Sequence, residues 1–175
     1  MGCTNRSLFL LLAVLISGLL VSFPAVHAEE SPQDETGAAG SWRIHEWKLQ
    51  TSLYTRHFDS DPDHVNHQKL IGIEAVCEND WLFGAAFFNN SFGQSTQLVY
   101  AGKSWPLFAS KFWYVKLMGG LVHGYEKPYE DKIPLNGLGT APVILPSLGF
   151  RYKRVFIETN IAGTAAVTIT GGLAF

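Results

Sequence analysis

The chain is short and nearly neutral. It has 175 residues, with 13 lysines and arginines against 15 aspartates and glutamates, and a formal net charge of −2 at pH 7. This length fits one domain, and so small a charge argues against nucleic acid as a partner. The sequence has no Gly-rich phosphate loop, no nucleophile elbow and no zinc-binding spacing, so no cofactor or metal is expected.

The first residues have the pattern of an export signal. Arg6 supplies a positive start, and the apolar run 8–21 that follows is too short to span a membrane comfortably. Small residues then lead to Ala28, so we expect a signal peptide over residues 1–28 that is cleaved after Ala28. Cys3 would leave with this leader.

The mature chain is expected to begin with a loose tail and continue as one β domain. Residues 29–41 are small and polar with no helical stripe, which predicts a flexible periplasmic tail. Residues 42–175 show no apolar pattern of period 3.6. Cys77 is the only cysteine left there, so no disulfide within the chain can hold the fold.

Short segments that alternate between apolar and polar residues with period two predict β-strands. The eight candidate strands are residues 47–56, 71–77, 81–89, 94–102, 113–121, 141–151, 155–161 and 167–175. Polar or turn-like connections separate them, notably residues 78–80, 103–110, 127–140 and 153–154.

The charged residues of these strands fall on the face opposite the large apolar residues. They are Lys48, Arg56, Glu74, Lys116, Arg151 and Glu158. A soluble sandwich places its apolar face inside, whereas an outer-membrane barrel places it against lipid. We therefore expect an all-β fold, an eight-stranded antiparallel transmembrane β-barrel of the outer membrane. The alternative is a periplasmic eight-stranded barrel that binds a lipid, but its outer surface would carry too many large apolar residues.

Counting strands from a periplasmic tail places two polar groups on the same outer rim. The first strand runs outward to Arg56-His57-Phe58, and the third runs outward to Asn90-Ser91. The connection 126–140 belongs to that rim as well. Short turns then lie on the periplasmic side, as in known outer-membrane barrels, and residues 103–110 form the exception.

A histidine beside a serine is the smallest set of side chains for acyl transfer. The His57 imidazole can take the hydroxyl proton of Ser91. Asn90 can donate an amide hydrogen bond to a developing oxyanion. From the pattern alone, the alternative that His57 and Ser91 are polar rim residues without a chemical role stays open.

A second group of potential ligands follows the first strand. It comprises His57, Asp59, Asp61, Asp63, His64 and His67. Two or three of them could bind a metal, but their spacing fixes no tetrahedral geometry. A solvated acidic loop, or one that meets the divalent cations of lipopolysaccharide, fits the pattern better than a catalytic metal site.

Several of these motifs resemble those of the PagP-type lipid A palmitoyltransferases, which are outer-membrane barrel enzymes. The motifs are Arg56-His57-Phe58, Phe88-Asn89-Asn90-Ser91-Phe92, Ile133-Pro134-Leu135, Pro142-Val143-Ile144-Leu145-Pro146-Ser147 and the aromatic C-terminus. The resemblance implies a monomer that moves a palmitoyl chain from a phospholipid donor to lipid A in the outer leaflet. It assigns catalysis to His57 and Ser91. Asn90 stands where the family has an acidic residue, so Asn90 orients its neighbours, the activity is weakened, or Asp59 or Asp61 substitutes.

The resemblance also implies a lipid-binding interior. Gly102, which lies eleven residues after Ser91, matches the glycine at the floor of the family's acyl pocket and shares the inward face with Leu98 and Tyr100. A rise of ~3.3 Å per residue and a tilt of ~45° place Gly102 roughly 25 Å below the rim. The alternative is a glycine that eases barrel curvature.

Two prolines in one strand weaken its pairing, because a proline donates no backbone hydrogen bond. In the family, such weak pairing beside Pro142 and Pro146 lets lipid move sideways into the barrel. An irregular start of the strand explains Pro142 more easily than Pro146.

Two other functions remain as alternatives. One is a lipid A deacylase on a similar barrel, although the His-x-Ser-Asn run of the known deacylases is missing. The other is a non-catalytic barrel, either a small structural protein or a narrow solute channel. An interior that holds Tyr54, Phe88, Tyr100 and Met118 among its charges is expected to be too occupied for a free channel.

Overall fold

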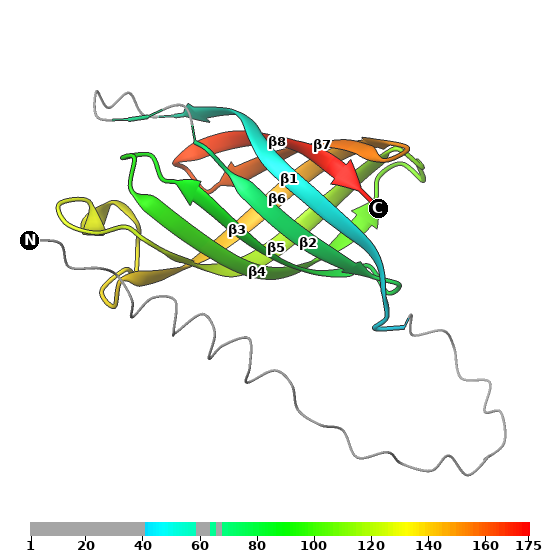
Figure 1. Cartoon of the computed structure of the whole chain (residues 1–175), viewed down its shortest axis with the longest axis horizontal. Coiled ribbons are helices and arrows are strands. Elements are labelled where there is room, and N and C mark those ends of the chain that lie inside the picture. The colour runs from blue at the N-terminus through cyan, green and yellow to red at the C-terminus, as the bar shows by residue number, and fades with distance from the viewer. Residues whose placement is uncertain (1–40, 59–63, 66–67) are drawn as a thin grey trace, which may run out of the picture. The chain divides into compact units, whose positions relative to one another are not determined.

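The predicted eight-stranded antiparallel β-barrel is confirmed by a computed structural model that describes residues 41–58, 64–65 and 68–175. Its strands are β1 (Ile44–His57), β2 (Ile71–Cys77), β3 (Trp81–Asn89), β4 (Ser95–Pro106), β5 (Trp113–His123), β6 (Thr140–Tyr152), β7 (Val155–Ala162) and β8 (Ala166–Ala174). Each strand pairs with the next in the chain, and β1 pairs with β8 to close the barrel (Figure 1). The predicted signal peptide, and all of the predicted tail except Ser41, lie outside the described residues.

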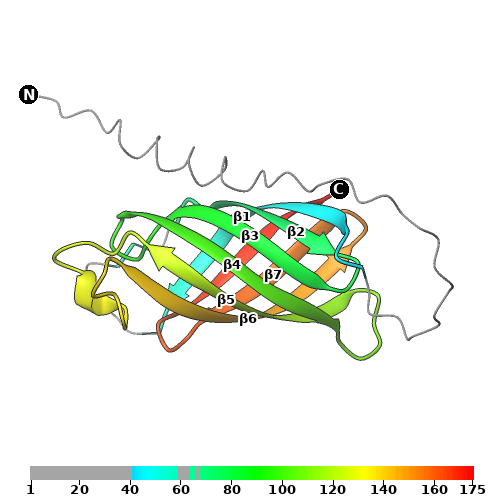
Figure 2. The ribbon, with the colours of Figure 1, turned by 90° about the horizontal axis from the view of Figure 1, so that it is seen from below.

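The connections between strands differ at the two ends of the barrel. We call the end with the connections 78–80, 107–112 and 153–154 the short-turn rim. The opposite end, the loop rim, carries the connections 58–70, 90–94, 124–139 and 163–165 (Figures 1 and 2). The 3-10 helix η1 (Glu130–Lys132) lies in the connection between β5 and β6. Among the described residues, no helix is long and apolar enough to cross a membrane.

The connection predicted at residues 103–110 lies at residues 107–112. Strand β4 runs on to Pro106, and the Leu107 amide donates to the Trp113 carbonyl at 2.8 Å. Lys103 and Ser104 read as polar turn residues in the sequence, but Lys103 pairs with both β3 and β5, and Ser104 pairs with β5. The connection 107–112 remains the longest one on the short-turn rim.

Four buried charges meet in the lumen. Lys116 Nζ lies 2.8 Å from both Glu74 Oε2 and Glu158 Oε2, and Lys48 Nζ lies 3.3 Å from Glu74 Oε1 and 3.5 Å from Glu158 Oε1. All four residues are at most 6% exposed. This charged quartet comes from β1, β2, β5 and β7, and its two positive and two negative charges balance. The predicted inward position of these four residues is confirmed.

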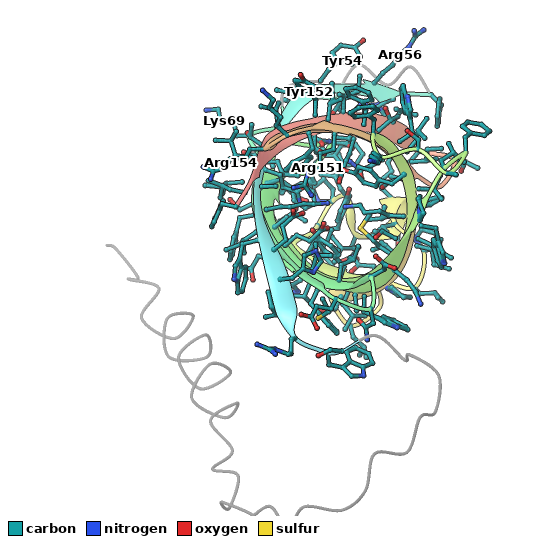
Figure 3. All side chains as sticks on the ribbon, turned by 90° about the vertical axis from the view of Figure 1, so that its right-hand side faces the viewer. Tyr54, Arg56, Lys69, Arg151, Tyr152 and Arg154 are labelled. Atoms are coloured by element: carbon teal, nitrogen blue, oxygen red, sulfur yellow. The ribbon has the colours of Figure 1, made fainter. Side chains whose placement is uncertain are left out.

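Arg151, the fifth charged residue that was predicted to face inward, lies nearer the short-turn rim. It is partly buried and forms an ion pair with Glu46 of β1. Figure 3 looks along the barrel and shows the strands as a closed ring with side chains filling its interior. On the outer face, large apolar side chains such as Leu49, Val99 and Ile144 are exposed.

A β-bulge in β1 changes which residues face the lumen. The register with β8 shifts between Ser52 and Tyr54, so the alternation that holds from Glu46 to Ser52 is broken by one extra residue. Tyr54 is 54% exposed, and Arg56 also lies on the outside, so the predicted inward positions of both were wrong (Figure 3). The same shift turns His57 inward, which strict alternation would have placed on the outer face.

Two pairs of neighbouring strands separate near the loop rim. The ladder between β6 and β7 begins at Ser147, so β6 residues 140–146 have no partner on the β7 side. The ladder between β1 and β2 ends at Thr51, and side-chain hydroxyls replace it beyond that point. There the Thr51 hydroxyl donates to the Leu70 carbonyl at 2.7 Å, and the Leu70 amide donates to the Ser52 hydroxyl at 3.2 Å.

Exposed aromatic side chains gather at the short-turn rim. They are Trp81 at the start of β3, Trp105 near the end of β4, Trp113 at the start of β5, Tyr152 at the end of β6, and Phe175. Trp42 stacks on Trp81 with ring centroids 5.7 Å apart. The outer surface of the barrel is thus apolar along its strands, with a belt of aromatic residues at one end.

Candidate active site

The two side chains that the sequence singled out are in direct contact. His57 Nε2 lies 2.6 Å from Ser91 Oγ. His57 is the last residue of β1, and Ser91 lies in the turn between β3 and β4. Strand β2 pairs with both β1 and β3, so the two residues lie on either side of β2 at the loop rim. A neutral imidazole at this distance can accept the serine proton.

The turn that carries Ser91 is built around the side chain of Asn90, which is fully buried. Asn90 Oδ1 accepts from the amides of Phe92 and Gln94, both at 3.0 Å. Asn90 Nδ2 donates to Gln94 Oε1 at 3.1 Å and to the Gly124 carbonyl at 3.2 Å. Both amide protons are therefore taken, which argues against Asn90 as an oxyanion donor and for a role in orienting its neighbours.

A tyrosine that the sequence analysis did not select lines the same cavity as Ser91. Burial raises the pKa of the Tyr125 phenol, and the nearby Ser91 side chain offsets part of the rise. The phenol is therefore fully protonated at neutral pH and available as a donor.

The backbone before Tyr125 has an unusual conformation that only glycine adopts easily. Gly124 has φ +124°, and a Cβ at this position would lie 2.4 Å from the Ser95 carbonyl oxygen. The chain thus passes closely over the start of β4 before Tyr125. On the far side, Asn136 Nδ2 donates to the Tyr125 carbonyl at 2.8 Å. Counting strands placed this connection on the correct rim, but gave no sign of which way Tyr125 points.

Aromatic rings surround the His57–Ser91 pair on the loop rim. The His64 ring lies against the His57 ring with centroids 4.2 Å apart, and the Phe92 ring lies 5.3 Å from that of His64. Phe92 in turn stacks on Tyr129 at 4.1 Å, nearly parallel. These contacts limit the freedom of His57 and of the turn after Ser91. Phe92 belongs to a motif named in the sequence analysis and His64 was considered only as a metal ligand, whereas nothing in the sequence pointed to Tyr129.

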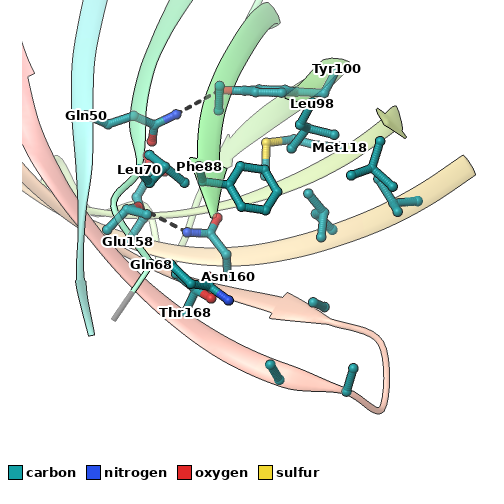
Figure 4. A pocket seen from close by; sticks show the side chains of 18 of the residues that line it. Gln50, Gln68, Leu70, Phe88, Leu98, Tyr100, Met118, Glu158, Asn160 and Thr168 are labelled. Atoms are coloured by element: carbon teal, nitrogen blue, oxygen red, sulfur yellow. Dashed lines mark hydrogen bonds between the residues drawn. The ribbon is translucent and has the colours of Figure 1, made fainter. Parts of the chain in front are cut away.

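A mostly apolar cavity of about 170 Å³ extends from Ser91 into the lumen. Ser91 and Tyr125 line it near the loop rim. Figure 4 shows Phe88, Leu98 and Met118 in its wall. Its apolar wall comprises Leu70, Phe88, Leu98, Met118, Val122 and Leu145, among others. At depth it reaches Tyr100 and the quartet residues Lys116 and Glu158. Tyr100 is fixed there, because its hydroxyl donates to Glu74 Oε2 at 3.1 Å and accepts from Gln50 Nε2 at 2.9 Å.

Of the three pocket residues predicted on β4, one lies outside the cavity. Leu98 and Tyr100 line the cavity, whereas Gly102 does not. The earlier depth estimate counted turn residues that do not advance along the barrel, because β4 begins only at Ser95. From Ser95, a rise of ~3.3 Å per residue and a tilt of ~45° put Tyr100 about 12 Å below the rim, and Gly102 about 16 Å.

Gly102 has a different structural reason to be glycine. A Cβ at this position would lie 2.4 Å from the Leu117 carbonyl oxygen and 2.9 Å from Met118 Cα. Strands β4 and β5 therefore approach too closely here for any side chain. Tyr100 and Met118 line the cavity, whereas Gly102 does not, so we take these two residues as its floor.

The two prolines of β6 lie beside the cavity and not in it. Pro142 and Pro146 face outward and are exposed, while Val143 and Leu145 between them line the cavity. The ladder to β7 begins at Ser147, the residue after Pro146. Across the separation, Asn160, Ala162 and Ala166 also line the cavity. The prolines therefore mark a place where the apolar cavity adjoins an unpaired part of the barrel wall.

The described residues contain no group of three or more His, Cys, Asp or Glu side chains that could hold a metal ion. Of the acidic loop considered in the sequence, Asp59, Asp61, Asp63 and His67 lie outside the described residues. The proposed substitution of Asp59 or Asp61 for the missing carboxylate therefore stays a prediction. No protein-family model and no curated protein matches the chain.

Proposed function

We propose that the protein is an outer-membrane acyltransferase that moves a palmitoyl or similarly long acyl chain from a phospholipid to lipid A. The observation that carries this proposal is the contact of 2.6 Å between His57 Nε2 and Ser91 Oγ at the mouth of an apolar cavity. A nucleophile with its base supplies the chemistry of acyl transfer, and the cavity supplies a place for part of the hydrocarbon chain.

The outer surface of the barrel supports a membrane location. Its strands expose Leu, Ile, Val and Phe side chains, and charged groups lie inside in the quartet. The aromatic belt at the short-turn rim fits a membrane–water interface, because indole and phenol rings prefer that layer. The loop rim, with the His57–Ser91 pair, would then face the outer leaflet, where lipid A resides.

Two half-reactions use the pair in the same way. Ser91 Oγ attacks the ester carbonyl carbon of the donor as its proton passes to His57 Nε2. The tetrahedral intermediate collapses, the ester bond breaks, and the leaving alkoxide of the lysophospholipid takes the proton from His57. A lipid A hydroxyl then attacks the acyl-serine ester and gives its proton to His57, and the departing Ser91 oxygen recovers it.

The separation of β6 from β7 supports a sideways route for the donor. A phospholipid in the leaflet could place one acyl chain through the unpaired wall beside Val143 and Leu145. Its headgroup would stay at the rim near Ser91. No passage along the whole barrel is needed, and the charged quartet leaves none.

The same observations bear on the alternative functions. A deacylase would use the same pair with water in place of the lipid A hydroxyl, so lipid A would lose a chain and not gain one. A solute channel is disfavoured, because all four residues of the quartet are nearly fully buried across the lumen.

The deciding experiment is mass spectrometry of lipid A from cells that express the protein or lack it. Acyltransfer predicts a mass increase by one acyl chain, and deacylation predicts a loss. Ser91→Ala should abolish the change. Ser95→Ala is a matched control, because Ser95 is an exposed serine at the start of the next strand. An unchanged lipid A at full barrel expression would reject the proposal.

A further inference from the structure

The transition state of acyl transfer needs a hydrogen-bond donor for the oxygen that becomes negatively charged. Several donors next to Ser91 in the chain are already engaged. The amides of Phe92 and Gln94 donate to Asn90 Oδ1, and the Gly93 amide donates to the Asn90 carbonyl at 2.9 Å. Asn90 Nδ2 donates to Gln94 and Gly124. The turn therefore uses these donors to hold Ser91 in place.

Tyr125 is placed to supply a donor from its side chain. Tyr125 and Ser91 line the same cavity, and the Ser91 side chain is close enough to the phenol to affect its pKa. In a tetrahedral adduct, the former carbonyl oxygen is only two bonds from Ser91 Oγ. A phenol beside Ser91 can therefore reach the oxyanion by a rotation of its side chain.

Three contacts fix the segment that carries Tyr125. The Asn90 side chain donates to the Gly124 carbonyl, and Asn136 donates to the Tyr125 carbonyl. The Gln94 side chain bonds the backbone of Glu126 twice, because Nε2 donates to its carbonyl at 3.1 Å and Oε1 accepts from its amide at 3.2 Å. Such a preorganised donor loses little free energy to reorganisation when charge develops.

We propose that Tyr125 is a catalytic residue, which donates a hydrogen bond from its hydroxyl to the oxyanion of both tetrahedral intermediates while His57 carries the proton. Tyr125 keeps its own proton throughout, so the proton balance of the two half-reactions is unchanged. This inference rests on the proposed acyltransfer and assigns one more group to it.

The test measures steady-state kinetics of the full barrel in detergent, with a synthetic dipalmitoyl phospholipid as donor and purified lipopolysaccharide as acceptor. Tyr125→Phe keeps the ring and removes the hydroxyl, and it should lower kcat roughly 100-fold with little change in the donor KM. Tyr152→Phe removes a hydroxyl from the opposite rim and should leave kcat unchanged. Heat-modifiable mobility on gels shows that each variant is folded.

A second measurement separates donation from packing. Replacing Tyr125 by 3-fluorotyrosine and by 3,5-difluorotyrosine keeps the ring and the hydroxyl and makes the phenol a stronger donor. At neutral pH, kcat should rise along this series. The series also decides the question if Tyr125→Phe does not fold.

The outcomes distinguish the two proposals. An unchanged kcat in folded Tyr125→Phe, or a flat fluorotyrosine series, would overturn the role of Tyr125 while the acyltransferase stands. If the unmodified protein transfers no acyl chain, and a long-chain alkyl fluorophosphonate does not label Ser91, the proposed function fails and this inference fails with it.

Discussion

The side chain of Asn90 donates to the carbonyl oxygen of Gly124 at 3.2 Å, and so joins the two turns that carry Ser91 and Tyr125. One buried amide thus sets the position of the nucleophile and of the group that we propose as its oxyanion donor. The residue that departs from the PagP-type motif is therefore in contact with both sides of the site. Its first predicted consequence concerns substitution at this position.

Replacing Asn90 should damage the site whichever residue replaces it. Asn90→Ala leaves buried polar partners unsatisfied, so we expect a loss of about 1–3 kcal/mol in stability together with a lower kcat. Asn90→Asp places a carboxylate against the Gly124 carbonyl. Because both groups are hydrogen-bond acceptors and no proton lies between them, this variant should also lower the rate. Thermal unfolding and donor kinetics measure both effects. A faster Asn90→Asp enzyme would instead support the acidic residue that the resemblance implies.

His57 and Ser91 should behave as one unit in a double-mutant cycle. Either alanine variant should abolish acyl transfer, and the double variant should be no slower than the singles, because each removes the same proton-transfer step. Stability should change by about 1 kcal/mol or less, since each substitution removes one hydrogen bond at a partly exposed site. Assays of the purified barrels with a phospholipid donor measure the transfer rate, and thermal unfolding measures the stability. Residual transfer by both single variants would contradict a shared role.

The length of the transferred chain should depend on Met118 and not on Gly102. Met118→Ala deepens the cavity, so longer acyl chains should be accepted, as shown by mass spectra of lipid A from cells with mixed donors. Gly102→Ala should destabilise the barrel without changing the selected length, because its Cβ would lie 2.4 Å from the Leu117 carbonyl oxygen. A folded Gly102 variant that transfers shorter chains would return the floor of the pocket to Gly102.

Pro146 should control access of lipid and not the chemical step. Pro146→Ala restores a backbone amide where the ladder to β7 stops, which favours extension of that ladder. Transfer from a membrane phospholipid should then slow, while release of p-nitrophenol from a soluble short-chain ester should stay unchanged. Ile144→Ala is a matched control, because Ile144 faces outward on the same strand. Equal slowing of both reactions would place Pro146 in the chemistry.

Breaking the charged quartet should cost more stability than the substitutions at the active site. Lys116→Met leaves Glu74 and Glu158 with excess negative charge in the lumen, and we expect a loss of about 3–5 kcal/mol. Lys116→Met combined with Glu158→Leu restores neutrality and should recover part of that loss. Urea unfolding of the barrel in detergent compares the single and double variants. A double variant that is less stable than the sum of its parts would rule out this compensation.

Polar and apolar residues that alternate with period two predicted the fold. In the barrel, Lys48, Glu74, Lys116 and Glu158 do face inward between apolar neighbours that face outward. It could not predict the bulge between Ser52 and Tyr54, because an extra residue in a ladder leaves no compositional mark. Strict alternation would have turned His57 away from Ser91. The rim was inferred correctly by counting strands, whereas the contact itself depends on the bulge.

The part of the site that sequence reasoning missed depends on turn geometry. Tyr125 follows Gly124, whose φ of +124° redirects the chain. A glycine after a strand indicates a turn but not its direction. The floor of the cavity was misplaced for a similar reason, because the turn before Ser95 adds residues without adding depth.

The charged quartet also constrains the order in which the barrel can assemble. Its members come from β1, β2, β5 and β7, so no single hairpin contains a complete set of partners. A partly zipped sheet would hold Lys48 beside Glu74 and Lys116 beside Glu158, but each pair would lack its contacts with the other pair. Such an intermediate would keep water in its lumen, because sealing it would bury charges that have only half of their partners. The final registration of β1 against β8 is then the event that lets water leave the lumen, and closure becomes an all-or-none step.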